Sequence, residues 1–322
     1  MSQKFKDNVR VLVHGDMSKL DGLMSRHFFN QLVAVSPELT QVPYTIRQLN
    51  DHVKRGQFTH VVIPDEHFHA LDESYTSCKV PVVELLGDHF VPWAIQRKKN
   101  YIRENGIKDV FVFSNRFLDP YTHLTNCHPV LVGYDAETFK DEGKERDIDI
   151  LVSGSLGQDT HRWVYPVRNW LADVVPEIGV KEGLKVKVKQ HPGYFPTKQP
   201  KKGYAEEYAG LLNRSKIAIG GSSHWRLLLK KLLEIPACGT ILLSDLPVDD
   251  SGFFKNRILE VDPEKIDSSG YVDVVRRRIC TALENYNSSK ARFQPFRTEQ
   301  DRFDRSYKGR ALEMRAILAQ IK

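Results

Sequence analysis

Three short segments of the chain combine glycine or serine with histidine or a cation. They are VSGSLGQDTHRW (152–163), KQHPGY (189–194) and GGSSHWR (220–226). Small residues let backbone N–H groups approach a phosphate, and cationic side chains add positive charge. One such turn is also typical of an ordinary strand–helix connection. Three of them predict an anion-binding rim suited to a diphosphate, with these candidates: Ser153, Gly154, Ser155, Arg162, Lys189, His191, Ser222, Ser223, His224 and Arg226.

Glu234 stands in KKLLEIPACGTILLSDLP (230–247), two residues before Pro236. We expect a helix over 224–235 that ends at this proline, because the residue before a proline disfavours helical backbone. A carboxylate near a helix C-terminus opposes the helix dipole by about 0.3–1 kcal/mol. This position favours a functional role, and accepting hydrogen bonds from two ribose hydroxyls suits a carboxylate. A local ion pair with Lys230 or Lys231 is the structural alternative.

The elements that must position these residues form two successive series of short apolar runs. Runs rich in Val, Ile and Leu without polar alternation predict parallel strands buried on both faces. Helical patterns separate them, at 20–35, 160–174, 204–214, 224–235 and 270–286. The predicted strands are 9–15, 59–64, 80–87, 109–114 and 129–134 in the first half, and 149–154, 184–192, 216–221, 240–245 and 257–262 in the second.

A polar segment, 135–149, separates the two series and predicts a linker. The fold class is therefore α/β, with two doubly wound, Rossmann-like domains facing each other across a cleft. We expect an N-terminal domain over 1–140, a C-terminal domain over 148–305, and a last helix at 306–322 that can pack back on either half, with the N-terminal domain as the first choice. Ligands of such sheets bind beyond the carboxyl ends of the strands, where the rim residues stand.

Composition narrows the functional classes. The chain has 322 residues, four separated cysteines and a net charge of +6. It shows no signal-peptide core and no run of eighteen apolar residues that would span a membrane, so we expect a cytoplasmic protein with reduced thiols. The basic runs favour a polyanionic partner: a nucleotide, a nucleic acid or an acidic membrane surface met peripherally. They are RKK (97–99), KVKVK (185–189), KQPKK (198–202) and RRR (276–278).

Four segments of the second half, DIDILVSGSL, KQHPGY, YAGLLNRSKIAIGG and LLEIPACGTILLSDLP, carry a family resemblance. In this order they resemble the C-terminal half of GT-B-fold glycosyltransferases, and they are most similar to family 4 and CgeB-like enzymes. The resemblance covers about residues 148–285, and its last motif is the most specific. It implies a nucleotide-sugar donor, a UDP-sugar first of all, held by the second domain.

The resemblance also implies roles for single residues. Glu234 takes the place of the ribose-binding glutamate, Arg162 and Lys189 those of diphosphate-binding cations, and the turn Gly239–Thr240 approaches the donor. Arg226 stands eight positions before Glu234, where the family 4 pattern has a first glutamate. This departure affects the contact with the donor sugar and leaves Arg226 as a second contact for phosphate.

A general base for the acceptor hydroxyl is expected after a first-half strand. The preferred pair is Asp88 and His89, because two adjacent titratable groups after a buried strand would face the ligand. Asp16 and the segment DEH (65–67) are the alternatives. The fold implies no metal and no resident cofactor, since side-chain cations offset the charge of the diphosphate. His67 and His69 share one strand face, but the pattern offers no third ligand.

The leading function is transfer of a sugar from a nucleoside-diphosphate sugar to a hydroxyl of a glycan, a lipid-linked acceptor or another small acceptor. One alternative is a DNA glycosyltransferase acting on hydroxymethylated bases, although RKKNYIRENG (97–106) is only a short basic and aromatic segment. A sugar-nucleotide epimerase would need more acids at the second-half strand ends. The alternative of another class is a non-catalytic module that binds a sugar nucleotide or a glycan.

Overall fold

The computed structural model describes residues 9–15, 32, 45–64, 73–87, 92–116, 118–156, 162–190 and 203–322. The chain divides into two compact units. Unit 1 comprises residues 1–132 and 307–322, and unit 2 comprises residues 133–306. Each unit is built on one five-stranded sheet in which all described pairings are parallel. This confirms an α/β fold with two Rossmann-like domains.

Sheet 1, in unit 1, has its strands in chain order, β1-β2-β3-β4-β5. Strand residues alternate between two apolar clusters, as the pleat requires: Val11 and Val13 of β1 pack into one cluster, and Leu12 into the other. The strands are β1 (Val11–Val13), β2 (His60–Ile63), β3 (Val82–Leu86), β4 (Asp109–Val112) and β5 (Asn126–Pro129).

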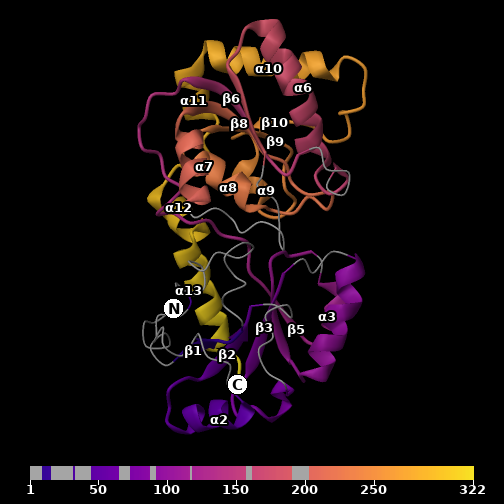
Figure 1. Cartoon of the computed structure of the whole chain (residues 1–322), viewed down its shortest axis with the longest axis vertical. Helices are drawn as coiled ribbons and strands as arrows, with labels where there is room; N and C mark the ends of the chain where they lie inside the picture. The colour runs from indigo at the N-terminus through magenta and orange to yellow at the C-terminus, as the bar shows by residue number, and fades with distance from the viewer. Residues whose placement is uncertain are drawn as a thin grey trace. The chain divides into compact units, whose positions relative to one another are not determined.

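Helix α13 (Tyr307–Leu318), from the end of the chain, covers one face of sheet 1 (Figure 1). Its buried residues Tyr307, Ala311, Met314 and Leu318 recur at three- and four-residue spacing, which places them on one side of a helix. Unit 1 therefore needs the last residues of the chain to complete its core.

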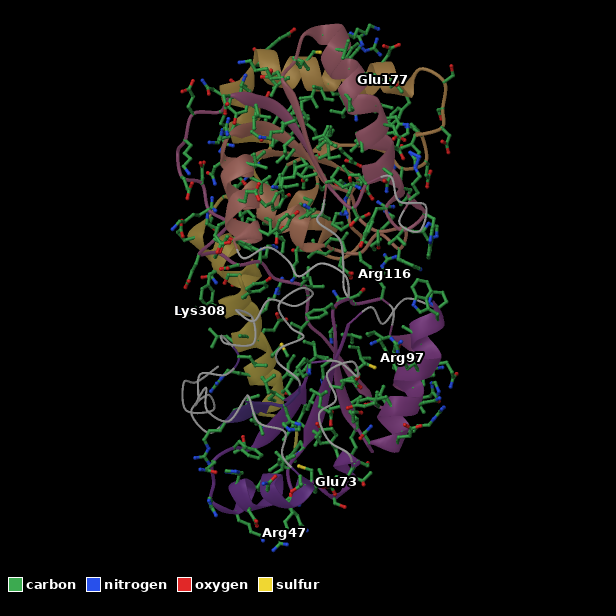
Figure 2. All side chains as sticks on the ribbon, in the orientation of Figure 1. Arg47, Glu73, Arg97, Arg116, Glu177 and Lys308 are labelled. Carbon is green, nitrogen blue, oxygen red and sulfur yellow. The ribbon has the colours of Figure 1, made fainter. Side chains whose placement is uncertain are left out.

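Helices α2 (Ile46–Lys54) and α3 (Pro92–Glu104) contribute Ile46, Leu49 and Ile102 to the cluster on the other face. Helix α2 begins at Thr45, whose hydroxyl accepts from the N–H of Gln48 in a capping box. Arg47 of the same helix points away from the sheet (Figure 2). Two single turns complete the described helices of unit 1: η5 (Tyr75–Ser77) and α4 (Asp119–Thr122).

Sheet 2, in unit 2, has the order β10-β9-β8-β6-β7, with β6 in the middle and its successor β7 at the edge. Its strands are β6 (Ile148–Gly154), β7 (Val186–Gln190), β8 (Ser215–Ile219), β9 (Ile241–Ser244) and β10 (Leu259–Glu260). The helices are α6 (Pro166–Glu182), α7 (Tyr204–Asn213), α8 (Lys230–Ala237), α9 (Ser251–Phe254), α10 (Tyr271–Glu284), α11 (Tyr286–Arg292) and α12 (Glu299–Arg305).

Three predicted elements differ from the structure. The last strand of sheet 1 is 126–129 rather than 129–134, because this edge strand is half exposed and therefore polar. Helix α6 starts later than predicted, with Pro166 as its first residue, and it ends at Gly183 in the left-handed conformation. Helix α8 begins at Lys230, not 224, and Pro236 lies inside it.

The segment 135–149, predicted as a linker, belongs to unit 2. Arg146 fixes it there: the guanidinium donates to the carbonyl oxygens of Leu212 and Cys238 at 3.0 and 2.7 Å and to the hydroxyl of Thr240 at 2.9 Å. The chain enters and leaves the unit at one place, because Tyr134 donates its N–H to the carbonyl of Arg305 at 3.0 Å.

Candidate functional site

The strand order of sheet 2 reverses between β6 and β8. From β6 the chain goes outward to β7, then returns to pair β8 with the other side of β6. Ligands of open α/β sheets bind at such a reversal, beyond the carboxyl ends of the two strands, where the connections part to opposite sides. At this place Ser153 and Gly154 end β6, and Gly220 to Ser223 follow β8. Two of the three predicted rim segments therefore meet at the switch point.

Two glycines let these strand ends lie against α6. Gly154 has φ 133° and Gly221 φ 146°, a region that favours glycine. A Cβ on Gly154 would lie 3.1 Å from Cδ of Arg168, and one on Gly221 would lie 2.8 Å from Cβ of Arg168. The glycines are thus required for packing, and they bring Arg168 between the two strand ends.

Arg168 is 4% exposed, and its guanidinium lies over the ring of Tyr165, 4.3 Å from the centroid. One amino group donates to the carbonyl of Gly221 at 3.1 Å. Its Nε is buried and has no hydrogen-bond acceptor among the described residues. A buried donor without an acceptor costs about 1–3 kcal/mol, more when charged. The guanidinium therefore keeps unused capacity for an anion.

Lys231 brings a second cation to the same place. Its Nζ lies 3.5 Å from the hydroxyl of Ser153 and 3.8 Å from the ring centroid of Tyr208. Burial and the nearby charge of Arg168 lower the pKa of Lys231 to about 7, although Glu234 acts in the opposite direction. The environment thus disfavours the charged ammonium until negative charge arrives.

Both cations stand in the first turn of a helix, Arg168 as the third residue of α6 and Lys231 as the second of α8. Neither first turn carries an acidic residue. The N-terminal end of a helix is itself positive, so a cation there is unfavourable. In the part of the chain that the structure describes, neither side chain forms an ion pair. A buried cation and a half-buried one at two helix N-termini are an arrangement that a bound anion would stabilise.

Glu234 is the fifth of the eight residues of α8, one turn beyond Lys231. Burial raises the pKa of this carboxyl, while the neighbouring Lys231 and Lys230 act in the opposite direction. Over the described ranges its carboxylate forms no ion pair within 4 Å, so the local salt bridge considered as the structural alternative is not formed. The carboxylate is available to accept hydrogen bonds beside the two cations.

The two cations that the resemblance assigned to a diphosphate are engaged elsewhere. Arg162 forms an ion pair with Asp173, and Lys189 forms one with Glu207. Lys189 lies on β7, the edge strand of sheet 2, where lysines prevent pairing with another strand. The structure does not bring either residue together with Arg168 and Lys231 in a shared contact. Sequence reasoning missed Arg168 and Lys231, although Pro166 as a helix-start signal and the three-residue spacing to Glu234 could have found them.

Ser222 and Ser223 hold the loop after β8 in place. The N–H of Ser222 donates to Asp245 at 2.9 Å, and its hydroxyl also bonds to Asp245. Burial raises the pKa of Asp245, while the bonds from Ser222 lower it. Arg226, with φ 57°, donates through its guanidinium to the carbonyl of Leu246 at 3.0 Å. This predicted phosphate contact thus serves to tie the loop after β8 to the loop after β9.

Gly239 and Thr240 directly precede β9. They therefore lie at the amino ends of the strands of sheet 2 and not at the carboxyl ends. Gly239 has φ 71°, and a Cβ there would lie 2.2 Å from a carboxylate oxygen of Asp141. The hydroxyl of Thr240 donates to the carbonyl of Leu212 at 2.7 Å. The turn therefore anchors the segment 135–149, and the structure does not place it at the carboxyl edge with Glu234.

The remaining predicted residues lie outside the described part of the chain: Asp16, Asp65, Glu66, His67, His69, Asp88, His89 and His191. At the carboxyl end of β1 the structure describes His14, which is 2% exposed, with Nδ1 2.6 Å from the hydroxyl of Tyr75. Within the described ranges no three His, Cys, Asp or Glu side chains gather as metal ligands. No described helix is long and apolar enough to cross a bilayer.

The basic run RKK (97–99) does not form one cationic face. Arg97 is exposed, but Lys98 is 1% exposed on the inner side of α3. The run KVKVK (185–189) lies largely on the edge strand β7. One lysine of RKK therefore faces inward, and the lysines of KVKVK lie on an edge strand, where they hinder pairing with another strand.

Comparison with known proteins gives structural matches only. A scan against protein-family models finds no match, and a search of curated proteins finds none. Anabaena Alr3699/HepE, solved in complex with UDP and glucose, matches with TM-score 0.60 and 9% identity over 97% of this chain and 100% of that one. A glycosyltransferase from Rickettsia africae ESF-5 matches with TM-score 0.54 and 11% identity over 97% of each chain.

The pneumococcal O-GlcNAc transferase GtfA also matches, with TM-score 0.49 and 11% identity over 81% of this chain. This chain spans only 56% of its length. At these identities the matches bear on fold alone. Together with the two parallel sheets and the reversal in sheet 2, the matches to HepE and to the Rickettsia glycosyltransferase show that the chain has the two-domain GT-B fold of glycosyltransferases.

Proposed function

We propose that the chain is a glycosyltransferase that moves a sugar from a nucleoside-diphosphate sugar, with UDP-sugars as the first candidates, to a hydroxyl of a glycan, lipid-linked or other small acceptor. The cations at the switch point of sheet 2 support a diphosphate ligand. The fold match to HepE, solved with UDP and glucose, supports a UDP-sugar.

The observation that carries this proposal is the buried guanidinium of Arg168, whose Nε has no acceptor among the described residues. With Lys231 it can bind the two phosphates of a donor at the ends of β6 and β8. When the sugar–oxygen bond breaks, negative charge grows on the leaving diphosphate. Fixed cations in a partly buried site stabilise that charge without reorganisation, which is how they would lower the barrier.

Glu234 and the general base complete the proposed reaction. The carboxylate of Glu234 accepts hydrogen bonds from the ribose hydroxyls and so sets the direction in which the donor lies. Asp88 and His89 are our candidates for the base that deprotonates the acceptor hydroxyl. Transfer needs no metal in this scheme, because Arg168 and Lys231 supply the positive charge.

A thermal-shift screen against UDP-, GDP-, ADP-, TDP- and CMP-linked sugars tests the donor class. A ligand that binds only the folded state at 100 times its Kd stabilises it by about 2.7 kcal/mol, which raises the midpoint by several degrees. We expect the largest shift with a UDP-sugar. No shift with any of these compounds would contradict the donor proposal.

Two variants separate an enzyme from a binding module. We expect Glu234→Ala to weaken donor binding about tenfold and to reduce turnover, because the hydrogen bonds to ribose are lost. Asp88→Asn should leave donor affinity unchanged and abolish most turnover, by about 100-fold or more. Lys255→Met, an exposed charge removal on unit 2, is the control for both. Wild-type turnover in Glu234→Ala would reject the site.

A further inference from the structure

Three aromatic rings of unit 2 form one cluster: Trp163, His224 and Trp225. The centroids of Trp163 and Trp225 are 5.4 Å apart, those of His224 and Trp225 5.6 Å, and those of Trp163 and His224 6.2 Å. All three pairs meet edge to face, with interplanar angles of 62–87°. Trp163 is nevertheless 45% exposed, and His224 is exposed. The cluster therefore presents aromatic surface to solvent.

The cluster stands on the two loops that flank the switch point. Trp163 lies between β6 and α6, while His224 and Trp225 lie between β8 and α8. The N–H of His224 donates to the carbonyl of Val164 at 2.7 Å and joins the two loops. Ser222, two residues earlier, is held by Asp245. The rings are thus fixed in position before any ligand binds, which lowers the entropy cost of binding.

The surroundings of the cluster favour an uncharged ligand. Arg162 and Arg226 flank it in sequence, but their guanidinium groups bind Asp173 and the carbonyl of Leu246. Exposed aromatic surface next to polar groups is typical of a ligand site. A sugar ring fits this chemistry, because its C–H face packs on an aromatic ring while its hydroxyls can bond to the exposed imidazole of His224.

The order of groups along the chain indicates which part of a donor meets the cluster. Glu234 lies three residues after Lys231, about 4.5 Å further along α8. The aromatic residues precede the cations on both loops: Trp163 comes before Arg168, and Trp225 before Lys231. The rings stand on the two loops that lead directly into α6 and α8, whose first turns carry the cations, so a sugar attached to a diphosphate there meets these loops.

We propose that Trp163, His224 and Trp225 form the subsite for the transferred sugar ring of the donor. This inference rests on the proposed function. The sugar is recognised by packing on the exposed ring of Trp163 and by hydrogen bonds with the imidazole of His224, and Arg226 contributes by fixing the loop.

Calorimetric titration with UDP, UDP-glucose and UDP-GlcNAc tests the subsite, using whichever sugar nucleotide the wild-type protein binds more tightly. We expect Trp163→Ala to raise the Kd of the sugar nucleotide about tenfold and to leave the Kd of UDP unchanged. Trp163→Phe keeps an aromatic ring, so its Kd for the sugar nucleotide should lie between those of the wild-type protein and of Trp163→Ala. The matched control is Trp93→Ala on α3 of unit 1, a tryptophan 67% exposed, which should change neither Kd.

Unchanged binding of UDP shows at the same time that the variant is folded. Equal weakening of UDP and the sugar nucleotide by Trp163→Ala would overturn the subsite, since the ring would then serve the nucleoside or the fold. No change in either Kd would also overturn it, as would a rise only in the KM of the acceptor. If the wild-type protein binds neither UDP nor any nucleotide sugar of the thermal-shift screen, the proposed function itself fails, which is a distinct result.

Discussion

The two sheets are built from similar strands but differ in strand order. In sheet 1 the described strands lie side by side in chain order, from β1 to β5. In sheet 2 all strands are parallel as well, but their order across the sheet reverses between β6 and β8. The reversal places two helix N-termini, two glycines with positive φ, the buried Arg168 and the half-buried Lys231 at neighbouring strand ends. At the described carboxyl edge of sheet 1, His14 is instead closed off by its bond to Tyr75. Topology, more than composition, therefore locates the candidate anion site.

The largest expected effect concerns the dependence of sheet 1 on the end of the chain. A stop after Ser306 removes four buried residues of α13, each contributing about 1.5–3 kcal/mol where a large apolar side chain is lost. This sum is comparable to the whole stability of a domain. We expect unit 1 to unfold while unit 2 stays folded, as seen by limited proteolysis with mass spectrometry.

The control for this truncation is a stop after Ile321, which keeps the four buried residues of α13 together with Ala319 and Ile321, and it should leave unit 1 resistant to protease. If the chain that stops after Ser306 keeps both units equally resistant to protease, unit 1 does not depend on α13 for its stability, and the expected difference between the two units is wrong.

The next effect concerns the cations of sheet 2. Arg168→Gln and Lys231→Met each remove a charge-assisted hydrogen bond to the phosphates, and we expect each to weaken UDP binding about 100-fold. Lys231→Arg, which keeps the charge, should lose less. Calorimetry measures the affinities, and Lys255→Met should match the wild-type protein. The opposite result would be weaker UDP binding in Arg162→Gln and Lys189→Met and unchanged UDP binding in Arg168→Gln and Lys231→Met. It would show that Arg162 and Lys189 bind the diphosphate, as the resemblance implied.

Gly221→Ala tests the close approach at the reversal. The new Cβ would lie 2.8 Å from Cβ of Arg168 at φ 146°, so both contact and backbone become strained. We expect a loss of about 2–3 kcal/mol in the free energy of unfolding, measured with urea. Gly203→Ala, also at positive φ but with no atom within 4 Å, should cost about 1 kcal/mol. Equal costs would show that packing against α6 does not require the glycine.

A further effect is a dependence on pH. The pKa of Lys231 is lowered to about 7 in the folded protein, so above pH 7 the unfolded chain binds more protons than the folded one. Stability should therefore gain a contribution that rises from pH 7 to about pH 10, and Lys231→Met should lack it. A bound diphosphate favours the protonated amine, so UDP binding above pH 7 should take up a proton. Calorimetry in buffers of different ionisation enthalpy measures this uptake, and none would contradict the low pKa.

The apolar runs predicted most strands correctly because strands buried on both faces leave a continuous signal. Strand β5 escaped this rule, since Asn126 and His128 belong to a half-exposed edge. The start of α8 was predicted six residues early, because HWRLLL continues the helical spacing. In the structure these residues form a loop in which Arg226 takes a left-handed conformation.

The candidate site was predictable in outline only. Strand ends rich in Gly and Ser pointed to the carboxyl edge, and Glu234 lies beside the two cations. The sequence alone could not show which arginine is placed to bind an anion. Arg162 and Arg168 are the same residue type and differ only in burial and in the groups that they contact. That Gly239 serves the segment 135–149 depends on Asp141 and Arg146, about a hundred residues earlier, and no local pattern reports such a contact.

The discontinuity of unit 1 has a consequence for synthesis on the ribosome. Residues 133–306 of unit 2 are synthesised between the two segments of unit 1, residues 1–132 and 307–322. Sheet 1 therefore keeps one face uncovered until α13 has been made, after the whole of unit 2. During that interval the nascent chain exposes Val11, Val62 and Phe111, and this is when it most needs protection by a chaperone.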